Sequence, residues 1–397
     1  MSTDYIFRRL ILAVFGPFRI GLGLFISILP YRFLWVKYTK LGHLLVEIDG
    51  LLKDVEIGGL QKRNWILLYD RENIANPAFI ELIPSFIHTI QVPTFCINFS
   101  KLLLRSKFSS TDVTDYGTAM NSSAKIISLN SLWLNRAPTV NLPVDWVSQK
   151  NILFENLGLQ KNQNYVCIHA RDSRDLDTKG LQHSARNVDI SSFTRAVKYL
   201  AKHNVIVFRM GDPSMPRLDD LCDKHDNLYD YAHMKCRAPR LDLVLSANCM
   251  FFVGSDSGAS YMPTIFNRPL VLVGAALPFK FCTSGFERDF GIPKLLRKID
   301  TEELCSFKEI FANGLSECRT KEEISQKGYE FVENTEEEIE EVVAEMFERL
   351  SGSWSSTDFD EQLQHKAQSL IPPRSYTYGS KSRCGSLFLR RYSHLVI

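Results

Sequence analysis

Short, uninterrupted apolar runs recur along the second half of the chain and are typical of strands in a parallel sheet. Such strands are covered on both faces, so they lack the polar alternation of a half-exposed strand. The runs lie at Tyr165–Ile168, Val205–Phe208, Met250–Gly254 and Leu270–Gly274. Two amphipathic segments predict helices: residues 189–200, which follow a capping Asp189, and residues 335–350, which open on the capping box Thr335–Glu338. This alternation predicts a β/α domain.

The first half of the chain alternates in a similar way. Residues 65–70 read as a buried strand, residues 76–87 as a helix with Pro77 in its first turn, and residues 92–99 as a further strand. The mixed, turn-rich residues 121–151 are a natural end for a first domain. The pattern predicts an α/β protein of two Rossmann-like β/α domains that face each other, each with a parallel sheet. The predicted divisions are residues 1–32, 33–150, 151–350 and 351–397.

The N-terminal segment differs from the rest in its composition. Residues 10–29 are apolar enough to span a bilayer, yet Arg19 stands in their middle. A central arginine costs about 2.5–3.5 kcal/mol on insertion scales. The first forty residues carry six lysines and arginines and one acid, Asp4. This balance predicts a segment that lies in the headgroup layer of an anionic membrane. The alternatives are a true membrane span and a buried helix pair broken at Pro17.

The other end of the chain is also basic. Residues 371–397 contain five lysines and arginines and no acid, with the apolar pair Leu387–Phe388 before Arg390 and Arg391. We expect the two basic ends to share one surface that attracts an anionic leaflet. The predicted location is therefore the cytoplasmic face of the plasma membrane, with peripheral attachment. The alternative is that the tail packs on the protein and its charges are solvated.

Overall composition narrows the function classes. The chain has 397 residues, 45% of them hydrophobic and 23% charged, which fits a two-domain globular protein. A net charge of +2 gives no reason to expect a nucleic-acid partner. Nine cysteines, an odd number without a C-x-x-C pair, predict reduced thiols in a cytosolic protein. The histidines show no metal-ligand spacing, so we expect neither a metal nor another cofactor.

Polar residues follow three of the predicted strands, at the edge where ligands bind in open α/β sheets. They are His169, Arg171 and Asp172 after the first strand, Arg209, Gly211 and Asp212 after the second, and Ser255, Asp256, Ser257, Gly258 and Ser260 after the third. Gly254 and Gly258 would allow a tight turn into a helix whose first N–H groups bind an anion. Arginine forks from the neighbouring strands would neutralise a diphosphate. The sequence therefore predicts a site for a phosphorylated ligand.

Each of these motifs also has a simpler interpretation. An arginine at a strand end can form a salt bridge, and Asp172 or Asp175 could supply the partner. The segment "GSDSG" can be a turn that caps a helix, and His169 can be a hydrogen-bonded structural residue. Their placement at three successive strand ends favours the binding site.

Taken together, these motifs resemble a family of bacterial glycosyltransferases encoded with surface-polysaccharide genes. The resemblance rests on "CIHARDS", "SARNVDISSF", "VFRMGD", "NLYDYA", "ANCMFFVGSDSGAS", "FNRPLVLVG" and "FVENTEEEIEEVV", with "KLGHL" near the start and "CGSLFLRR" near the end. In outline it implies a two-domain transferase of the GT-B fold. The strand end also resembles the "HxRRxD" motif of fucosyltransferases: His169, Arg171 and Asp172 are kept with Ala170 between the first two, but the adjacent second arginine is missing. This departure argues against a GDP-fucose donor and leaves a diphosphate donor possible.

The implied reaction is metal-independent transfer of a sugar from a nucleotide-sugar to a glycan or lipid-linked acceptor. In this interpretation Arg171 and Arg209 stabilise the leaving diphosphate, with the serine-rich helix start. An inverting mechanism needs a base, and His43 is the candidate because a Gly-His pair after the first strand would open a loop toward the cleft. Asp70 and Glu72 are runners-up, and a helix-start histidine bonded to backbone is the alternative. A sugar-nucleotide epimerase and a non-catalytic nucleotide- or glycan-binding scaffold remain further possibilities.

Overall fold

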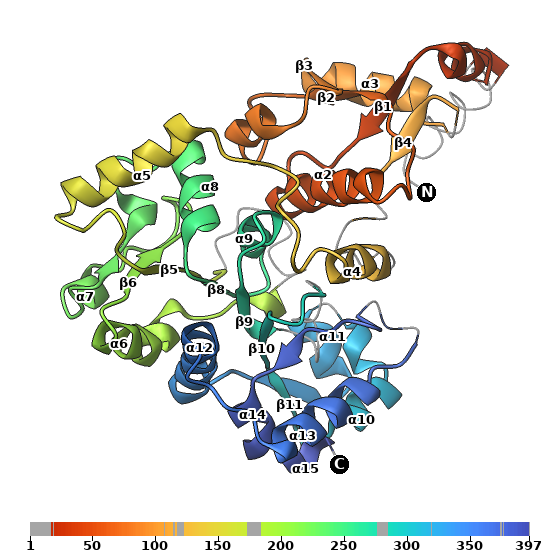
Figure 1. Ribbon diagram of the computed structural model, residues 1–397. Coiled ribbons are helices and arrows are strands. Elements are labelled where there is room, and N and C mark those ends of the chain that lie inside the picture. Colours follow the sequence, from red (N-terminus) through yellow and green to blue (C-terminus); the bar gives the residue numbers. More distant parts are fainter. Residues whose placement is uncertain are drawn as a thin grey trace. The chain divides into compact units, whose positions relative to one another are not determined.

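The computed structural model divides into two compact units, residues 1–117 and 118–397, each of which is described by itself. The described residues are 17–18, 20–106, 108–113, 116, 123–172, 184–275, 285–318, 320–373, 375 and 377–396 (Figure 1). Both units contain parallel sheets with helices between the strands. The predicted α/β class and the parallel sheets are therefore confirmed.

Unit 1 is built on a four-stranded parallel sheet in the order β3-β2-β1-β4. The strands are β1 (Tyr31–Trp35), β2 (Asn64–Tyr69), β3 (Ile87–Gln91) and β4 (Ser110–Asp112). Its helices are α2 (Leu41–Glu56), the 3-10 helix η1 (Pro77–Leu82) and α3 (Thr94–Leu104). Leu34 of β1, Trp65 of β2 and Leu44 of α2 are fully buried, and the Phe33 ring stacks on the Trp35 ring with centroids 5.5 Å apart.

Two elements of unit 1 differ from the prediction. The predicted strand at residues 92–99 is the start of helix α3, because Asp70 accepts hydrogen bonds from the Thr94 N–H and hydroxyl and so caps a helix there. Ile97 is its one fully buried described residue, whereas a core strand would bury every second side chain. The predicted helix at residues 76–87 is only the short η1, which ends at Leu82, before strand β3.

Unit 2 contains a seven-stranded parallel sheet in the order β13-β10-β9-β8-β5-β6-β7. The strands are β5 (Tyr165–His169), β6 (Ile206–Arg209), β7 (Leu228–Tyr229), β8 (Phe252–Gly254), β9 (Leu270–Ala275), β10 (Phe290–Pro293) and β13 (Arg383–Cys384). A separate two-stranded antiparallel sheet pairs β11 (Leu295–Lys298) with β12 (Tyr329–Val332). All four strands predicted in this half are confirmed.

The helices of unit 2 cover this sheet (Figure 1). They are α4 (Ser123–Ser131), α5 (Val144–Asn156), α6 (Thr194–Lys202), α7 (Asp219–Cys222), α8 (Pro239–Asn248), α9 (Met262–Ile265), α10 (Phe307–Ala312), α11 (Lys321–Gln326), α12 (Glu336–Ser351), α13 (Asp358–Ser369), α14 (Ser386–Arg391) and α15 (Ser393–Val396). The Thr335–Glu338 capping box of α12 is confirmed, as is the Asp189 cap. An aromatic cluster of Phe154, Tyr165 and Phe208 joins α5 to the central strands.

The boundary between the units lies earlier than the predicted division at residue 150. Helices α4 and α5 belong to unit 2 because they make their contacts there: α5 packs on α8, and the Asn267 side-chain amide donates to the carbonyls of Trp133 and Arg136. Among the described residues of this turn-rich stretch, residues 132–143 form the loop between α4 and α5.

The basic C-terminal segment packs on unit 2. Arg383 pairs with Glu361 at 2.7 Å, Arg390 with Asp360 at 2.6 Å and Arg391 with Glu341 at 2.8 Å. Phe388 is buried as well. Carboxylates of α12 and α13 thus pair with three of the arginines that were predicted to meet a membrane. For these three, the tail packs on the protein, as the alternative interpretation had it.

The described N-terminal residues 20–28 are helical. The Arg32 guanidinium donates to the carbonyls of Ile26 and Ser27 at 3.0 and 3.2 Å, which closes the end of this helix onto strand β1. Gly23 and Ile26 are buried, whereas Ile20, Leu24, Phe25 and Ile28 are exposed. Among the described helices, none has both the length and the hydropathy to cross a membrane.

Candidate functional site

The strand order of unit 2 locates its ligand-binding edge. From β5 the chain adds β6 and β7 on one side, and then β8, β9 and β10 on the other, which is the order of a Rossmann-like sheet. In such sheets the ligand crevice opens where the order reverses, here between the carboxyl ends of β5 and β8. The Arg171 N–H donates to the Ser255 hydroxyl at 2.8 Å, and the Ser255 N–H donates to the His169 carbonyl at 3.0 Å. These bonds fix the two strand ends side by side.

Arg171 occupies this reversal point, as the sequence predicted. Its side chain is half-buried, and its carbonyl accepts the Val188 N–H at 2.9 Å. The backbone on both sides of the side chain is therefore held by hydrogen bonds. Asp172 follows it and lines the cavity described below. The two residues are placed to contact a ligand at the sheet edge.

His169 has a structural role, so the simpler interpretation holds. The ring is 5% exposed, and its Nδ1 lies 3.2 Å from the Met210 carbonyl, to which it donates. Burial lowers the pKa of His169 to about 4, and the neighbouring Arg209 charge acts in the same direction. The imidazole is therefore neutral at physiological pH. It joins β5 to the segment after β6, and its predicted contact with a donor remains a prediction.

Arg209 is the last residue of strand β6 and lines the cavity described below, but its side chain is buried and paired within the protein. It is 2% exposed, and its guanidinium contacts Asp230 at 3.0 Å and donates to the Pro216 carbonyl at 3.1 Å. Its charge is thus compensated within the protein. The partner lies 21 residues downstream, and no local sequence pattern marks it.

The segment that follows Arg209 forms a tight turn. The Asp212 carboxylate accepts the Ser214 N–H at 2.9 Å, as in an Asx turn. A Cβ atom on Gly211 would lie 2.6 Å from the Met215 sulfur. The predicted contacts of Gly211 and Asp212 with a ligand remain predictions, because these two residues already have a role in holding the turn.

The serine-rich segment after β8 leads into a short 3-10 helix, η6 (Gly258–Tyr261), and then into α9. The Ser260 hydroxyl donates to the Ser255 carbonyl at 2.6 Å. A Cβ atom on Gly254 would lie 2.2 Å from the Ser260 hydroxyl oxygen, so glycine is required for this close approach. Ser257 stands at the N-terminal cap of η6 without a side-chain cap bond. The predicted anion-binding helix start is thus present only as a 3-10 turn that begins at Gly258.

A second arginine, absent from the predicted set, lies at the same edge. Arg186, in the 3-10 helix η3 (Ser184–Arg186), has its guanidinium 3.7 Å from the Asp256 carboxylate. Asp256, predicted to bind the donor, thus faces a cation of its own chain. The motif "SARN" that contains Arg186 was part of the resemblance, but no strand end precedes it and so no role was assigned.

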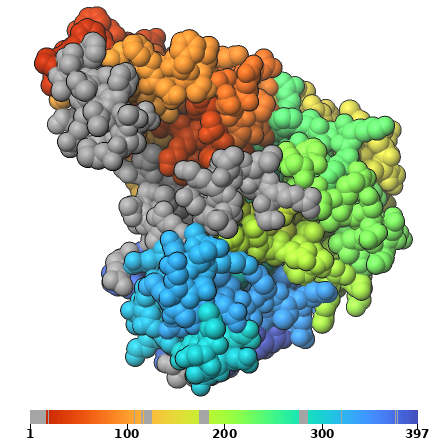
Figure 2. Space-filling model, turned by 180° about the vertical axis from the view of Figure 1, so that it is seen from behind, coloured from red at the N-terminus to blue at the C-terminus, as the bar shows by residue number. Residues whose placement is uncertain are grey.

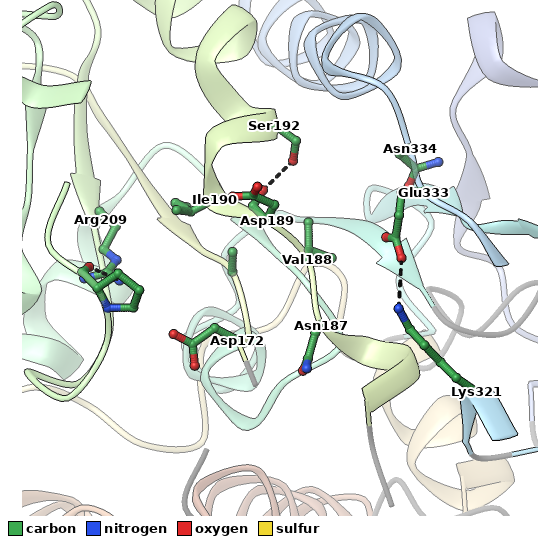
Figure 3. Close-up of a pocket in the computed structure, with 12 residues that line it drawn as sticks. Asp172, Asn187, Val188, Asp189, Ile190, Ser192, Arg209, Lys321, Glu333 and Asn334 are labelled. Carbon is green, nitrogen blue, oxygen red and sulfur yellow. Dashed lines mark hydrogen bonds and ion pairs between the residues drawn. The ribbon is translucent and has the colours of Figure 1, made fainter. Parts of the chain in front are cut away.

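A cavity of about 430 Å³ opens beside these residues, which is within the range of ligand pockets. Figure 3 shows Glu333 and Lys321 on one side, Arg209 on the other, and Asp172 and Asn187 between them. The lining is Ala170, Asp172, Asn187, Val188, Asp189, Ile190, Ser192, Arg209, Pro216, Lys321, Glu333 and Asn334. Arg171 and Arg186 directly precede two of these lining residues.

The residues that flank the paired strands β11 and β12 form a further wall of the cavity, which was not predicted. Lys294 is fully buried; its ammonium donates to the Asn187 carbonyl at 2.7 Å and pairs with Glu333 at 2.7 Å. Burial lowers the pKa of Lys294, and the Glu333 carboxylate opposes that shift. Asn334 accepts the Gly274 N–H at 2.8 Å. In Figure 2 the light-blue surface of this part of unit 2 borders the yellow-green surface that leads into α6.

The cavity is rich in acceptor groups, which suits a ligand with hydroxyl groups. Asp172, Asp189 and Glu333 contribute carboxylates, and the amide oxygen of Asn187 is buried without a hydrogen-bond partner among the described residues. Arginines at the adjacent reversal point suit an anionic group. Together the two regions match a ligand that is polyhydroxylated at one end and anionic at the other.

His43 belongs to unit 1, where the structure corrects the expected loop. It lies in the first turn of α2, and its Nδ1 is 2.8 Å from a carboxylate oxygen of Glu47, one turn later. Its side chain is 27% exposed. The alternative interpretation, a histidine at a helix start bonded to backbone, is correct about the helix start, but the ring contacts the Glu47 side chain and not the backbone.

The runner-up bases are less suited to proton transfer. Both carboxylate oxygens of Asp70 accept hydrogen bonds, from the Glu72 N–H, Asn73 and Thr94. Hydrogen bonds from Thr94 and Asn73 lower the pKa of Asp70, which makes it a weaker base. Glu72 is exposed in the turn that follows β2.

Within the described ranges, no group of three or more histidine, cysteine, aspartate or glutamate side chains is arranged to hold a metal ion. The predicted independence from metals stays a prediction. Five of the eight described cysteines are buried, and Cys96 lies on helix α3.

No protein-family model matches the chain, and no curated protein matches it. Among solved structures, the chain is similar to the Escherichia coli heptosyltransferase WaaC with ADP (14% identity, 66% of this chain and 90% of the other, TM-score 0.38). It is also similar to a family 9 glycosyl transferase from Veillonella parvula (10% identity, 63% of this chain and 81% of the other, TM-score 0.42). A third similar structure is the E. coli ADP-heptose heptosyltransferase II (11% identity, 61% of this chain and 84% of the other, TM-score 0.38). At scores this low the similarities carry no argument of their own.

Proposed function

We propose that the protein is a glycosyltransferase that moves a sugar from a nucleotide-sugar donor to a glycan or lipid-linked acceptor in bacterial surface-polysaccharide synthesis. The observation that carries the proposal is the cavity at the reversal point of unit 2, which is rich in acceptors and adjoins Arg171 and Arg186. The carboxylates suit the hydroxyls of the nucleoside and sugar. The arginines suit the diphosphate.

The chemistry follows from these roles. An acceptor oxygen attacks the anomeric carbon while the bond from that carbon to the diphosphate oxygen breaks. The acceptor proton passes to a base, for which His43 is the candidate, and the nucleoside diphosphate leaves. Its growing charge is greatest in the transition state, so Arg171 and Arg186 would contribute most at that stage. No metal is needed in this scheme.

A panel of nucleotides tests the donor site. Thermal-shift and calorimetric titrations of the full chain with UDP, GDP, ADP, CMP and dTDP should show one base class that binds. The Arg171→Ala and Arg186→Ala variants should weaken that binding about 10–100-fold, since each loses a charge-assisted contact. Arg195→Ala is the matched control, because Arg195 is an exposed residue of α6 that pairs with Glu340 of α12.

The outcomes separate the candidate functions. If no nucleotide binds, or if both arginine variants bind as the unaltered protein does, the donor site is wrong. If a nucleotide binds but its sugar is neither transferred nor hydrolysed, the scaffold interpretation is correct. If the sugar is converted to its epimer while still attached to the nucleotide, the protein is an epimerase.

The acceptor and the location belong to the same proposal. The described N-terminal residues expose Phe18, Ile20, Leu24, Phe25 and Ile28, each at least 48%. Ile20, Leu24 and Ile28 follow one another at helical spacing, so they share one face. A helix that turns its apolar face to solvent suits the interface of a membrane. These exposed residues support the proposal that the protein acts at the inner face of the plasma membrane, where a lipid-linked acceptor would be available.

A further inference from the structure

Unit 1 has a reversal point of its own. Its sheet runs β3-β2-β1-β4, so the strand order reverses between β1 and β4. The segment after β1 and the first turn of α2 therefore lie at the edge where a second ligand-binding crevice is expected. His43 is in that first turn. The sequence predicted a loop at His43, whereas the structure shows a helix in which the ring contacts a buried carboxylate.

The Glu47 carboxylate fixes the position of the His43 ring through a hydrogen bond. Glu47 is fully buried; one of its carboxylate oxygens lies 2.8 Å from His43 Nδ1, and the other accepts the Lys37 N–H at 2.9 Å. Lys37 belongs to the segment between β1 and α2. The carboxylate thus ties the ring to the backbone of the same crevice, and both of its oxygens are used.

This contact determines which ring nitrogen can take a proton. A carboxylate oxygen accepts hydrogen bonds, so the shared proton lies on Nδ1 and the lone pair of the neutral ring lies on Nε2. The ring keeps 27% of its surface exposed although Glu47 is buried. A purely structural pair would bury both members, whereas here the acid is hidden and the imidazole can be reached.

We propose that Glu47 is a positioning residue for the acceptor-side base, a role that rests on the proposed glycosyl transfer. The acceptor hydroxyl gives its proton to His43 Nε2 as its oxygen forms the new bond to the anomeric carbon. The resulting imidazolium keeps its Nδ1–H on the Glu47 carboxylate, which stabilises the positive ring. Lys101 also lies close enough to Glu47 to interact with its charge, so the ring and the ammonium share one carboxylate.

The tautomer can be observed without any activity. Long-range ¹H–¹⁵N spectra of the full chain with ¹⁵N-labelled histidine give the protonation of each ring nitrogen, and His43→Gln identifies the His43 signals. The neutral His43 ring should carry its proton on Nδ1. In Glu47→Gln the population should move toward the Nε2–H form, which a histidine without a carboxylate partner prefers. A His43 ring with its proton on Nε2 in the unaltered protein would overturn the proposal.

Kinetics give the second test. Glu47→Gln should lower kcat about 10–100-fold, a part of the contribution of a well-placed base, with the donor KM unchanged because the donor site lies in unit 2. Glu56→Gln makes the same chemical change at the exposed end of α2 and should behave as the unaltered protein. Thermal unfolding of both variants shows whether the fold is retained.

The two proposals fail in different ways. If the unaltered protein neither binds nucleotide nor transfers sugar, the proposed function fails, while the tautomer result still reports on Glu47. If the unaltered protein transfers sugar and a folded Glu47→Gln does so at the same kcat, the positioning role fails and the proposed function stands. A rise in donor KM with kcat unchanged would also contradict the positioning role.

Discussion

Individual side chains at the sheet edge of unit 2 separate into those that hold the fold and those that can meet a ligand. Arg171 and Arg209 look equivalent in the sequence, since each follows an apolar strand. In the structure Arg171 is half-buried at the reversal point, whereas Arg209 is buried against Asp230. The difference depends on a carboxylate that is distant in sequence, so local patterns could not reveal it.

Arg209→Ala should therefore destabilise the protein. The substitution leaves the Asp230 carboxylate, which is 10% exposed, without its guanidinium partner. Removing one member of a buried pair costs about 3–5 kcal/mol. Urea unfolding of unit 2 should show this loss for Arg209→Ala and a much smaller one for Arg171→Ala. Equal unfolding midpoints for the two variants would contradict the structural role of Arg209.

His169 should make stability depend on pH. Its pKa is about 4 in the folded protein, below the ordinary value of 6.5, so the unfolded chain binds more protons between these two values. Its contribution is fully present above pH 6.5 and is lost as the pH falls through 4, by roughly 3 kcal/mol in total.

His169→Asn provides the comparison, because its amide can still donate to the Met210 carbonyl but does not titrate. The difference in unfolding free energy between the two proteins should shrink steadily from pH 6.5 to pH 4. A difference that is constant over this range would mean that His169 does not titrate with a lowered pKa.

At the scale of helices and strands, continuous apolar runs identified the strands of unit 2 correctly, because a parallel sheet buries both faces of each strand. Residues 92–99 were assigned to the wrong class because the same apolar content suits a helix, and the Asp70 side chain that caps this helix lies in the loop after strand β2, 24 residues away. The contact of His43 with Glu47 was within reach of the sequence, since the two residues stand at i and i+4, once the segment is read as a helix.

The C-terminal helices give a prediction at this scale. The Arg390 guanidinium forms two hydrogen bonds with Asp360 and lowers the pKa of that carboxyl to about 2. The ion pair therefore stabilises the packing of α14 on α13 above pH 4, the ordinary range of an aspartate, and the contribution is lost as the pH falls toward 2. Arg390→Ala should expose the tail to limited proteolysis at neutral pH.

Lys381→Ala is the control, since Lys381 is exposed in the same segment. If proteolysis cuts both variants at the same rate as the unaltered protein, the ion pair does not hold the tail.

For the molecule as a whole, the exposed N-terminal face predicts attachment to membranes. The full chain should sediment with vesicles that contain anionic lipid, and Phe25→Glu with Ile28→Glu should keep it in the supernatant, because two charges enter the apolar face. Val144→Glu with Ile152→Glu introduces the same charges at exposed apolar positions of unit 2 and should not change sedimentation. Loss of binding in both pairs would point to a general effect of charge.

Metal dependence is also a property of the whole catalytic cycle. Because arginines are assigned to the leaving group, transfer should continue in EDTA at the rate seen without chelator. Activity that disappears in chelator and returns with Mn²⁺ or Mg²⁺ would instead assign the charge stabilisation to a metal ion.

The pairing of β13 with β10 also has a consequence for biosynthesis. Strand β10 leaves the ribosome well before its partner β13. The strands β11 and β12 and the helices α10 to α13 are made in between. Until then the free edge of β10 presents unpaired N–H and C=O groups that can pair with another nascent chain. A truncation before Arg383 would make this exposure permanent. We therefore expect truncated chains to enter inclusion bodies even when the cavity residues are all present.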